Sequence, residues 1–335
     1  MTSVHAKRAR IEAVLAGERP DRLPLGLWVH FPDIDDDIEL LARATVDFYE
    51  RYDLDWIKVT PRMPSAIEDW GAKLGSYHPA RGFYFIADRP VKVAEDWRRL
   101  PYVPPDSYAQ GRQLALLRAV RALVGAEVPI LATLFAPSMM AGFVADDATF
   151  IHCLRNEPAA LTAGLATIAQ TTVDFGLACL KNGADGIFYS IKYASGRLIA
   201  EAEYASLDEG YDRPVAAALH AASRLTMLHL HGGELAFDRF ADFPAHVINW
   251  YDRVDGPQLD RVRPRIPDHT LCGGVDHERT LVIGTPQDVA FEVADAAAQM
   301  DGRAFLLGPG CTVPVVAKPE NLAAVRDTVA RLGRR

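Results

Sequence analysis

The sequence predicts an α/β protein in which eight parallel strands and their helices form a single (β/α)8 barrel. Three observations support this: short apolar runs alternate with helical stretches, there are eight such runs, and no glycine-rich dinucleotide turn follows an early strand. Alternation of this kind is typical of a parallel sheet covered by helices. The missing turn argues against the structural rival, an open doubly wound sheet.

The expected elements follow the chain in order. Strands are predicted at 23–29, 54–59, 128–135, 186–190, 225–231, 246–250, 270–276 and 303–308. Helices are predicted at 6–17, 38–52, 113–124, twice within 146–182, and at 214–223, 286–299 and 319–333. The first helix has apolar residues at helical spacing, and a glycine and a proline end it.

Residues 61–112 contain several prolines and predict an irregular insertion with a small hairpin at 82–87. A long insertion after a strand often forms part of a binding mouth. No linker or low-complexity stretch divides the 335 residues, so one domain covering 1–335 is expected.

Composition narrows the class of function. The net charge is −8 with mixed signs, and no run of five or more Lys or Arg occurs, which argues against a nucleic-acid partner. The N-terminus has no apolar signal region and no stretch reaches 18 uninterrupted apolar residues, so we expect a cytoplasmic protein without a membrane span. The four widely spread cysteines indicate thiols or metal ligands and not a disulfide framework.

Two histidines end the fifth predicted strand. His229 and His231 are two residues apart, so on a strand they point to the same side. In a parallel barrel that side opens at the mouth, where the chemistry of such barrels lies, and Cys311 follows the last strand at the same mouth. Two imidazoles and one thiolate are a ligand set for catalytic zinc. The alternative is histidines that hydrogen-bond substrate or a carboxylate, and a buried core cysteine.

Motifs along nearly the whole chain strengthen this picture. They lie at 17–24, 55–59, 183–185, 201–204, 229–233, 274–276, 284–286, 307–314 and 319–322. Together they resemble the uroporphyrinogen decarboxylase superfamily, whose members are (β/α)8 barrels. The resemblance implies either a cofactor-free decarboxylase or a zinc methyltransferase that moves a methyl group from a corrinoid protein to a thiol such as coenzyme M.

Local residues favour the methyltransferase branch. The resemblance implies that a true decarboxylase would carry an arginine-rich segment after the first strand. Residues 30–37 here hold four acids and no arginine. Four acids would repel a substrate with eight carboxylates. The methyltransferase branch carries His-x-Cys-Gly after the fifth strand and a Cys after the eighth, which His229, His231 and Cys311 match with His231 in place of the first Cys. A less negative ligand set leaves zinc a stronger Lewis acid and a bound thiolate less nucleophilic.

The resemblance and the residues together predict a metal-dependent methyltransferase with zinc on His229, His231 and Cys311. It would move a methyl group between a corrinoid, or another methylated small molecule, and a thiol or similar acceptor. The alternatives are a cofactor-free decarboxylase of uroporphyrinogen or a related tetrapyrrole, and a non-catalytic barrel that binds a corrinoid or tetrapyrrole. The expected partners are a small-molecule substrate, a corrinoid protein and a second copy in a homodimer.

Further candidates lie at the predicted strand ends. The candidate catalytic residues are Asp276, Ser190 and Tyr193. Asp276 could act as acid or base or orient a histidine, and its other interpretation is a loop cap. The candidate substrate contacts are Trp28, His30, Arg62, Tyr189 and Asn249.

Overall fold

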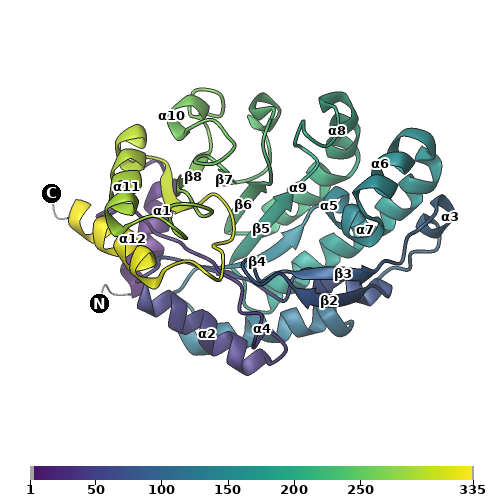
Figure 1. Ribbon diagram of the computed structural model, residues 1–335, viewed down its shortest axis with the longest axis horizontal. Helices are drawn as coiled ribbons and strands as arrows, with labels where there is room; N and C mark the ends of the chain where they lie inside the picture. The colour runs from purple at the N-terminus through teal and green to yellow at the C-terminus, as the bar shows by residue number, and fades with distance from the viewer. Residues whose placement is uncertain (1–3, 334–335) are drawn as a thin grey trace.

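The computed structural model describes residues 4–333 and has at its centre a curled sheet of parallel strands surrounded by helices (Figure 1). The sheet has seven strands in the order β1-β4-β5-β6-β7-β8-β9. Their bounds are β1 Ile57–Val59, β4 Ile130–Phe135, β5 Gly186–Ile191, β6 Leu225–Leu230, β7 Val247–Trp250, β8 Thr270–Val275 and β9 Phe305–Pro309. All neighbouring pairs are parallel, so their carboxyl ends lie at one edge of the sheet.

Seven of the eight predicted strands are confirmed, and the one predicted at 23–29 is not a regular strand. That segment makes two isolated parallel bridges, Leu25 with Leu307 and Val29 with Val313. It also accepts a hydrogen bond from the N–H of Asp55 at 2.7 Å, just before β1. Pro24 lacks an N–H and cannot donate to a ladder, which helps to explain why the pairing stays irregular.

Helices surround the sheet, on its outside and, for α1, at one end of its concave side. They are α1 Val4–Leu15, α2 Ile38–Arg51, α4 Tyr108–Val124, α5 Pro137–Ala145, α6 Asp147–Asn156, α7 Pro158–Lys181, α8 Glu201–Leu207, α9 Arg213–Ala222, α10 Leu259–Val262, α11 Pro286–Met300 and α12 Pro319–Leu332. The two helices predicted within 146–182 are α6 and α7. The carboxylate of Asp146 caps the start of α6 and Pro158 starts α7. The prediction missed α5, α8 and α10, and α4 begins five residues earlier than expected.

The insertion at 61–112 is more ordered than predicted. It contains the 3-10 helix η1 Ser65–Trp70, the antiparallel hairpin β2 Lys73–Tyr77 with β3 Tyr84–Asp88, and the short helix α3 Ala94–Trp97. The predicted hairpin is therefore confirmed, with longer strands. Figure 1 shows it projecting beside the sheet, between α4 and α7.

Hydrophobic residues pack on both faces of the sheet. The larger cluster lies between the strands and the helices. The smaller one fills the concave side with alternate strand residues, including Leu131, Phe188 and Met227, and with Ile11 and Val14 of α1. Helix α1 fills the concave side of the sheet at the amino-terminal ends of the strands. The carboxyl-terminal end of the concave side is therefore left for a ligand.

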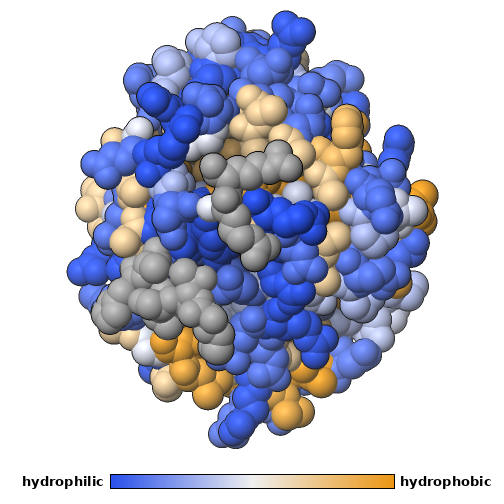
Figure 2. Space-filling model, turned by 90° about the vertical axis from the view of Figure 1, so that its left-hand side faces the viewer, coloured by the Kyte–Doolittle hydropathy of each residue, from blue (hydrophilic) through white to orange (hydrophobic). Residues whose placement is uncertain are grey.

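One helix among the described residues, α7, is long and apolar enough by composition to cross a membrane, with 24 residues and a mean hydropathy of 1.3. It packs against β4, α5, α6 and α9, as a core helix does. A single helix of this kind is weak support for a membrane span. Figure 2 shows that the face around the chain ends is mostly hydrophilic with scattered hydrophobic areas.

Candidate functional site

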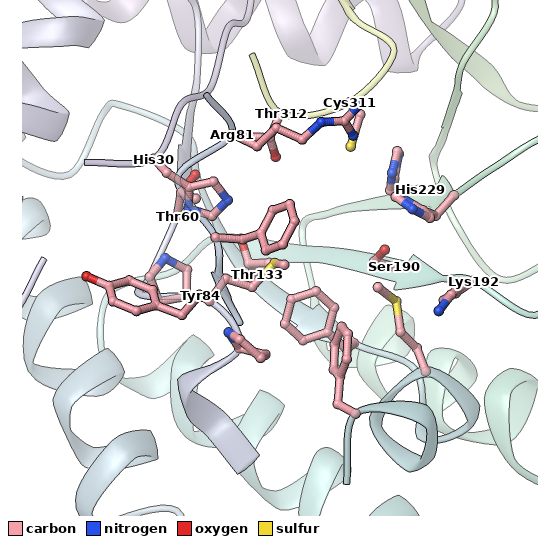
Figure 3. A pocket seen from close by; sticks show the side chains of 18 of the residues that line it. His30, Thr60, Arg81, Tyr84, Thr133, Ser190, Lys192, His229, Cys311 and Thr312 are labelled. Carbon is pink, nitrogen blue, oxygen red and sulfur yellow. The ribbon is translucent and has the colours of Figure 1, made fainter. Parts of the chain in front are cut away.

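A cavity of about 500 Å³ opens at the carboxyl ends of the strands. Each strand of the sheet contributes a side chain at or just beyond its end: Thr60, Thr133, Ser190, His229, Tyr251, His277 and Cys311. The hairpin and α5 add an apolar wall that includes Phe83, Phe85, Met139 and Phe143. Figure 3 shows Ser190 and His229 across the cavity from His30, Thr60 and Tyr84. Apolar walls with a few converging polar groups are typical of a small-molecule site.

His229, His231 and Cys311 converge in this cavity. One donor atom from each lies within 4.8 Å of the others, although the cysteine is 80 residues beyond the second histidine. His229 is the last inward-facing residue of β6, and the chain leaves that strand at His231. Strands β6 and β9, which two other strands separate in the sheet, thus bring the predicted metal ligands together.

The hydrogen bonds of His229 determine which of its ring nitrogens faces the cavity. The amide nitrogen of Asn249 donates to the carbonyl oxygens of Cys272, at 3.0 Å, and Pro309, at 3.1 Å. Its amide oxygen is therefore the atom 2.6 Å from Nδ1 of His229, and it accepts a hydrogen bond from the Nδ1–H group. Nε2 of His229 then carries the lone pair, and it is buried without a hydrogen-bond partner. An unpaired acceptor of this kind fits a metal ligand.

Protonation of His229 is disfavoured. Burial lowers the pKa of its imidazole to about 4. The hydrogen bond that His229 donates to Asn249 opposes this shift, and repulsion from Lys58 adds to it. The ring also stacks on Phe188 at a centroid distance of 5.3 Å. At neutral pH the imidazole is therefore uncharged, as metal binding requires.

Tyr251 connects the other two members of the cluster. Its hydroxyl lies 2.9 Å from Nδ1 of His231, and it also hydrogen-bonds the thiol of Cys311. Burial raises the pKa of the Cys311 thiol, but the hydrogen bond and electrostatic attraction of His231 and the hydrogen bond of Tyr251 lower it by more. The net lowering favours the thiolate, which is the nucleophilic and metal-binding form. A side-chain carbon at Gly310 would lie 3.0 Å from Cα of Tyr251, so glycine permits this approach.

Two further predicted residues line the cavity. Ser190 ends the inward face of β5, and His30 follows the first segment. Burial, followed by repulsion from Lys58, lowers the pKa of His30 to about 3. His30 is therefore a neutral hydrogen-bonding group at neutral pH.

Three predicted substrate contacts lie outside the cavity wall. Tyr189 alternates with Ser190 on β5, so its ring turns toward the helices, where its hydroxyl donates to the carbonyl of Asp212 at 2.9 Å. Asn249 is fully buried behind His229 and acts on that ring, as described above. Trp28 belongs to the inner hydrophobic cluster, with its ring 5.6 Å from that of Phe188. None of the three side chains lines this cavity, so their predicted contact with substrate stays a prediction.

Three other candidates are also placed elsewhere. Tyr193 packs against Gly142, where a side-chain carbon would lie 2.1 Å from the tyrosine oxygen, and it donates to Asp147 at 2.6 Å. Asp276 accepts the N–H groups of residues 278 and 279 at 2.8 and 2.9 Å, which is the loop-cap alternative. Arg62 lies on the Tyr84 ring, 3.3 Å from the Asp36 carboxylate, and so faces the acidic loop. Local hydrogen bonding and ion pairing decide all three placements.

The sequence analysis did not single out two cavity residues, namely Lys58 and His277. Burial lowers the pKa of His277 to about 3, and its Nδ1 has no hydrogen-bond partner. Lys58 stands between two apolar residues at the end of a predicted strand, a signal that could have identified it. A lysine at such a position is buried, and burial without a partner is unusual.

Comparison with known proteins agrees with this geometry. Residues 6–332 match the family described as uroporphyrinogen decarboxylase (URO-D). The chain is 26% identical over 244 residues to the methylcobamide:CoM methyltransferase MtbA of Methanosarcina mazei, covering 71% of this chain and 68% of that protein. It is 27% identical over 237 residues to MtbA of Methanosarcina acetivorans, covering 69% and 67%.

Solved structures share the fold. A methyltransferase from Methanosarcina mazei superposes with a TM-score of 0.84 at 18% identity, covering 97% of this chain and 98% of the other. A B12-independent methionine synthase from Shewanella sp. W3-18-1 superposes with a TM-score of 0.59 at 11% identity, covering 94% and 95%. From the match over residues 6–332 and the two related methyltransferases, the chain belongs to the uroporphyrinogen decarboxylase family, on its methyltransferase branch.

Proposed function

We propose that this protein is a zinc-dependent enzyme that moves a methyl group between a corrinoid and a small thiol. The observation that carries the proposal is the convergence of His229, His231 and Cys311 within 4.8 Å at the cavity. The related MtbA proteins are named for methylcobamide and CoM, a corrinoid donor and a thiol acceptor. We extend that pair of reactant classes, and not the individual molecules, to this chain.

The donor set fits zinc. Two imidazole nitrogens and one thiolate sulfur are ligands that zinc prefers, and three protein ligands leave a fourth position for a reactant. Nε2 of His229 is buried and unpartnered, which would be costly in a site that never receives a bonding partner. When bound, the metal supplies Lewis acidity that holds a thiol acceptor in its thiolate form.

The protein side chains orient the reactants and exclude water. Asn249 fixes the ring of His229, and Tyr251 holds both His231 and Cys311. The cavity of about 500 Å³ suits a small acceptor, and its phenylalanine wall keeps water from the reacting sulfur. In the transfer, a sulfur lone pair forms the new S–C bond while the cobalt–carbon pair stays on cobalt. The corrinoid leaves in its cobalt(I) form, and the thiol proton goes to solvent.

Zinc content tests the metal site. Protein purified without a polyhistidine tag and supplied with zinc should hold about one equivalent, and Cys311→Ala should hold far less. Cys179→Ala is the matched control, because Cys179 is a fully buried cysteine of α7 outside the cluster. If the native protein holds no zinc, or if both variants lose it equally, the metal site is wrong.

Methyl transfer tests the reaction. Zinc-loaded protein mixed with methylcobalamin and 2-mercaptoethanesulfonate should convert the corrinoid to its cobalt(I) form, observed by visible absorbance under anaerobic conditions. Cys311→Ala should reduce the rate to that of the mixture without protein. Absence of transfer to this thiol, to 3-mercaptopropionate and to 3-mercapto-1-propanol would overturn the proposal. Formation of coproporphyrinogen from uroporphyrinogen would instead support the decarboxylase alternative.

A further inference from the structure

The charged side chains that line the cavity differ in how they are compensated. Arg81 pairs with Glu278 at 2.7 Å, and Lys192 pairs with Asp147 at 2.6 Å. Arg89 donates to backbone carbonyl groups at the end of α5. Among the described residues that line the cavity, Lys58 is the cation for which the structure shows neither a carboxylate nor a carbonyl partner.

The surroundings of Lys58 are nearly all apolar. The side chain is 6% exposed, and its Nζ lies 4.6 Å from the centre of the Phe188 ring and 6.0 Å from that of Trp28. The polar contact that the structure shows for Nζ is a long one, 3.5 Å to the hydroxyl of Thr60. Burial lowers the pKa of this amine to about 7, against a weaker opposing attraction from Cys311.

These contacts do not balance the cost of burying an ammonium group. Cation–π contacts stabilise by about 0.5–2 kcal/mol, whereas burying one ion costs several kcal/mol even after the protein relaxes. A buried, uncompensated cation at the wall of a ligand cavity therefore lacks a partner that an anionic ligand would supply. The hydroxyl groups of Thr60 and Ser190 line the same cavity and can donate to such an anion.

We propose that Lys58 and Thr60 form a subsite for an oxyanion carried by the methyl acceptor. That the acceptor is a thiol rests on the proposed function, whereas the oxyanion subsite itself does not. A single lysine neutralises a single negative charge, so a carboxylate or a sulfonate fits better than a doubly charged phosphate. The anion would direct the other end of the molecule toward Cys311, whose charge acts on Lys58 across the cavity.

Matched thiols test the subsite in the zinc-loaded protein. Calorimetry should show that 2-mercaptoethanesulfonate or 3-mercaptopropionate binds about 10- to 100-fold more tightly than 3-mercapto-1-propanol, as for a hydrogen bond to a charged group. In Lys58→Met this preference should fall to about one, and in Lys58→Arg part of it should remain. The control is Lys73→Met, because Lys73 is exposed on the hairpin and its loss should leave the preference unchanged.

A second measurement separates the subsite from the reaction. In metal-free protein, ethanesulfonate and propionate should still bind more tightly than 1-propanol, and Lys58→Met should abolish the difference. If the preference survives in Lys58→Met, the subsite is wrong even when methyl transfer proceeds. If Lys58 governs anion binding in a protein that neither holds zinc nor transfers methyl groups, the proposed function fails and the subsite stands. Met replaces an ammonium with an apolar chain in an apolar setting, so the variant should fold.

Discussion

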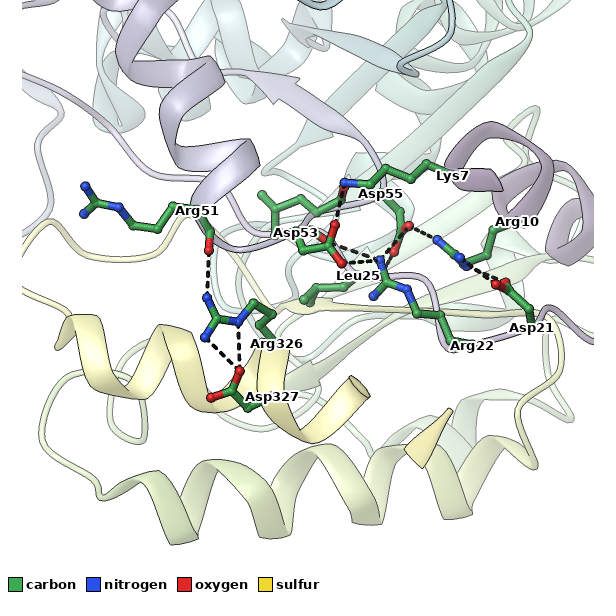
Figure 4. A network of polar contacts seen from close by, with 11 residues as sticks. Lys7, Arg10, Asp21, Arg22, Leu25, Arg51, Asp53, Asp55, Arg326 and Asp327 are labelled. Atoms are coloured by element: carbon green, nitrogen blue, oxygen red, sulfur yellow. Dashed lines mark hydrogen bonds and ion pairs between the residues drawn. The ribbon is translucent and has the colours of Figure 1, made fainter. Parts of the chain in front are cut away.

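A buried charged residue lies at each end of strand β1, and among the residues that the structure describes only the one at the amino-terminal end has partners of opposite charge. Asp55, just before the strand, is fully buried and accepts from Arg10, from Arg22 at 3.1 Å and from the N–H of Leu25 at 2.7 Å. Figure 4 shows this network extending to Lys7 of α1 through Asp53. Three residues later, Lys58 is buried at the cavity without a carboxylate partner.

The amino-terminal end of β1 thus has contacts that stabilise the fold, whereas the carboxyl-terminal end has unpaired polar groups suited to a ligand. At the amino-terminal end, ion pairs and a backbone hydrogen bond hold the irregular segment 24–29 against β1. At the carboxyl end, polar atoms remain unpaired, including Nε2 of His229 and Nδ1 of His277. Buried polar groups are normally satisfied, so unpaired nitrogens of residues that line a cavity at the carboxyl ends of parallel strands fit a binding end.

The largest expected effect is at the compensated end. Asp55→Asn leaves Arg10 and Arg22 without their buried countercharge and should lower the free energy of unfolding by about 3–5 kcal/mol. Urea unfolding measures this. The control is Asp21→Asn, which removes a partner of the same arginine whose own carboxylate is 62% exposed, and it should cost about 1 kcal/mol or less. Equal costs would show that burial of Asp55 is not what makes the pair important.

The next effect concerns the support of a proposed metal ligand. Asn249→Leu removes the acceptor that orients His229, and zinc affinity should fall by about 10- to 100-fold. Chelator competition measures the affinity. Asn321→Leu is a matched control, since Asn321 is also a fully buried amide that donates to backbone carbonyl groups, at 3.0 Å to Thr280 and 3.1 Å to Gly284. An equal loss of zinc affinity in both variants would reduce the effect to general destabilisation.

The smallest expected effect is a pH dependence of the stability difference between Lys58→Met and the wild type. The pKa of Lys58 is about 7 in the folded protein and 10.5 ordinarily, so between these values only the unfolded chain holds the proton. Wild-type stability then rises with pH across this window, and the full burial cost applies below pH 7. Lys58→Met does not bury an ammonium group, so its free energy of unfolding should exceed that of the wild type most at pH 7 and below. Its advantage in urea unfolding should shrink by at most about 1.4 kcal/mol between pH 7 and 8.

A constant difference between Lys58→Met and the wild type from pH 6 to 9 would contradict that interpretation. It would mean that Lys58 carries the same charge throughout, and that the rings of Phe188 and Trp28 stabilise the ammonium by more than about 2 kcal/mol. The anion subsite would then have to be judged from ligand binding alone.

The sequence by itself determined the alternation of strands and helices and the convergence of His229, His231 and Cys311. Both depend on short-range rules: strand residues two apart share a side, and parallel strands end at one edge. The proximity of the three side chains could therefore be predicted although 80 residues separate the last two. The resemblance of the motifs to one family gave the same barrel-like architecture, which the seven-stranded sheet confirms in part.

Only the tertiary structure decided which neighbouring residues face the cavity and which groups stay unpaired. Strand β5 is buried along its whole length, so its sequence shows no polar alternation that would separate Ser190 from Tyr189. Asn249 lies opposite His229 because of the register between β6 and β7, which no local pattern records. Lys58 lacks a carboxylate because of what the other strands place around it. Pairing of buried charge is a non-local property, and it is fixed only when distant segments meet.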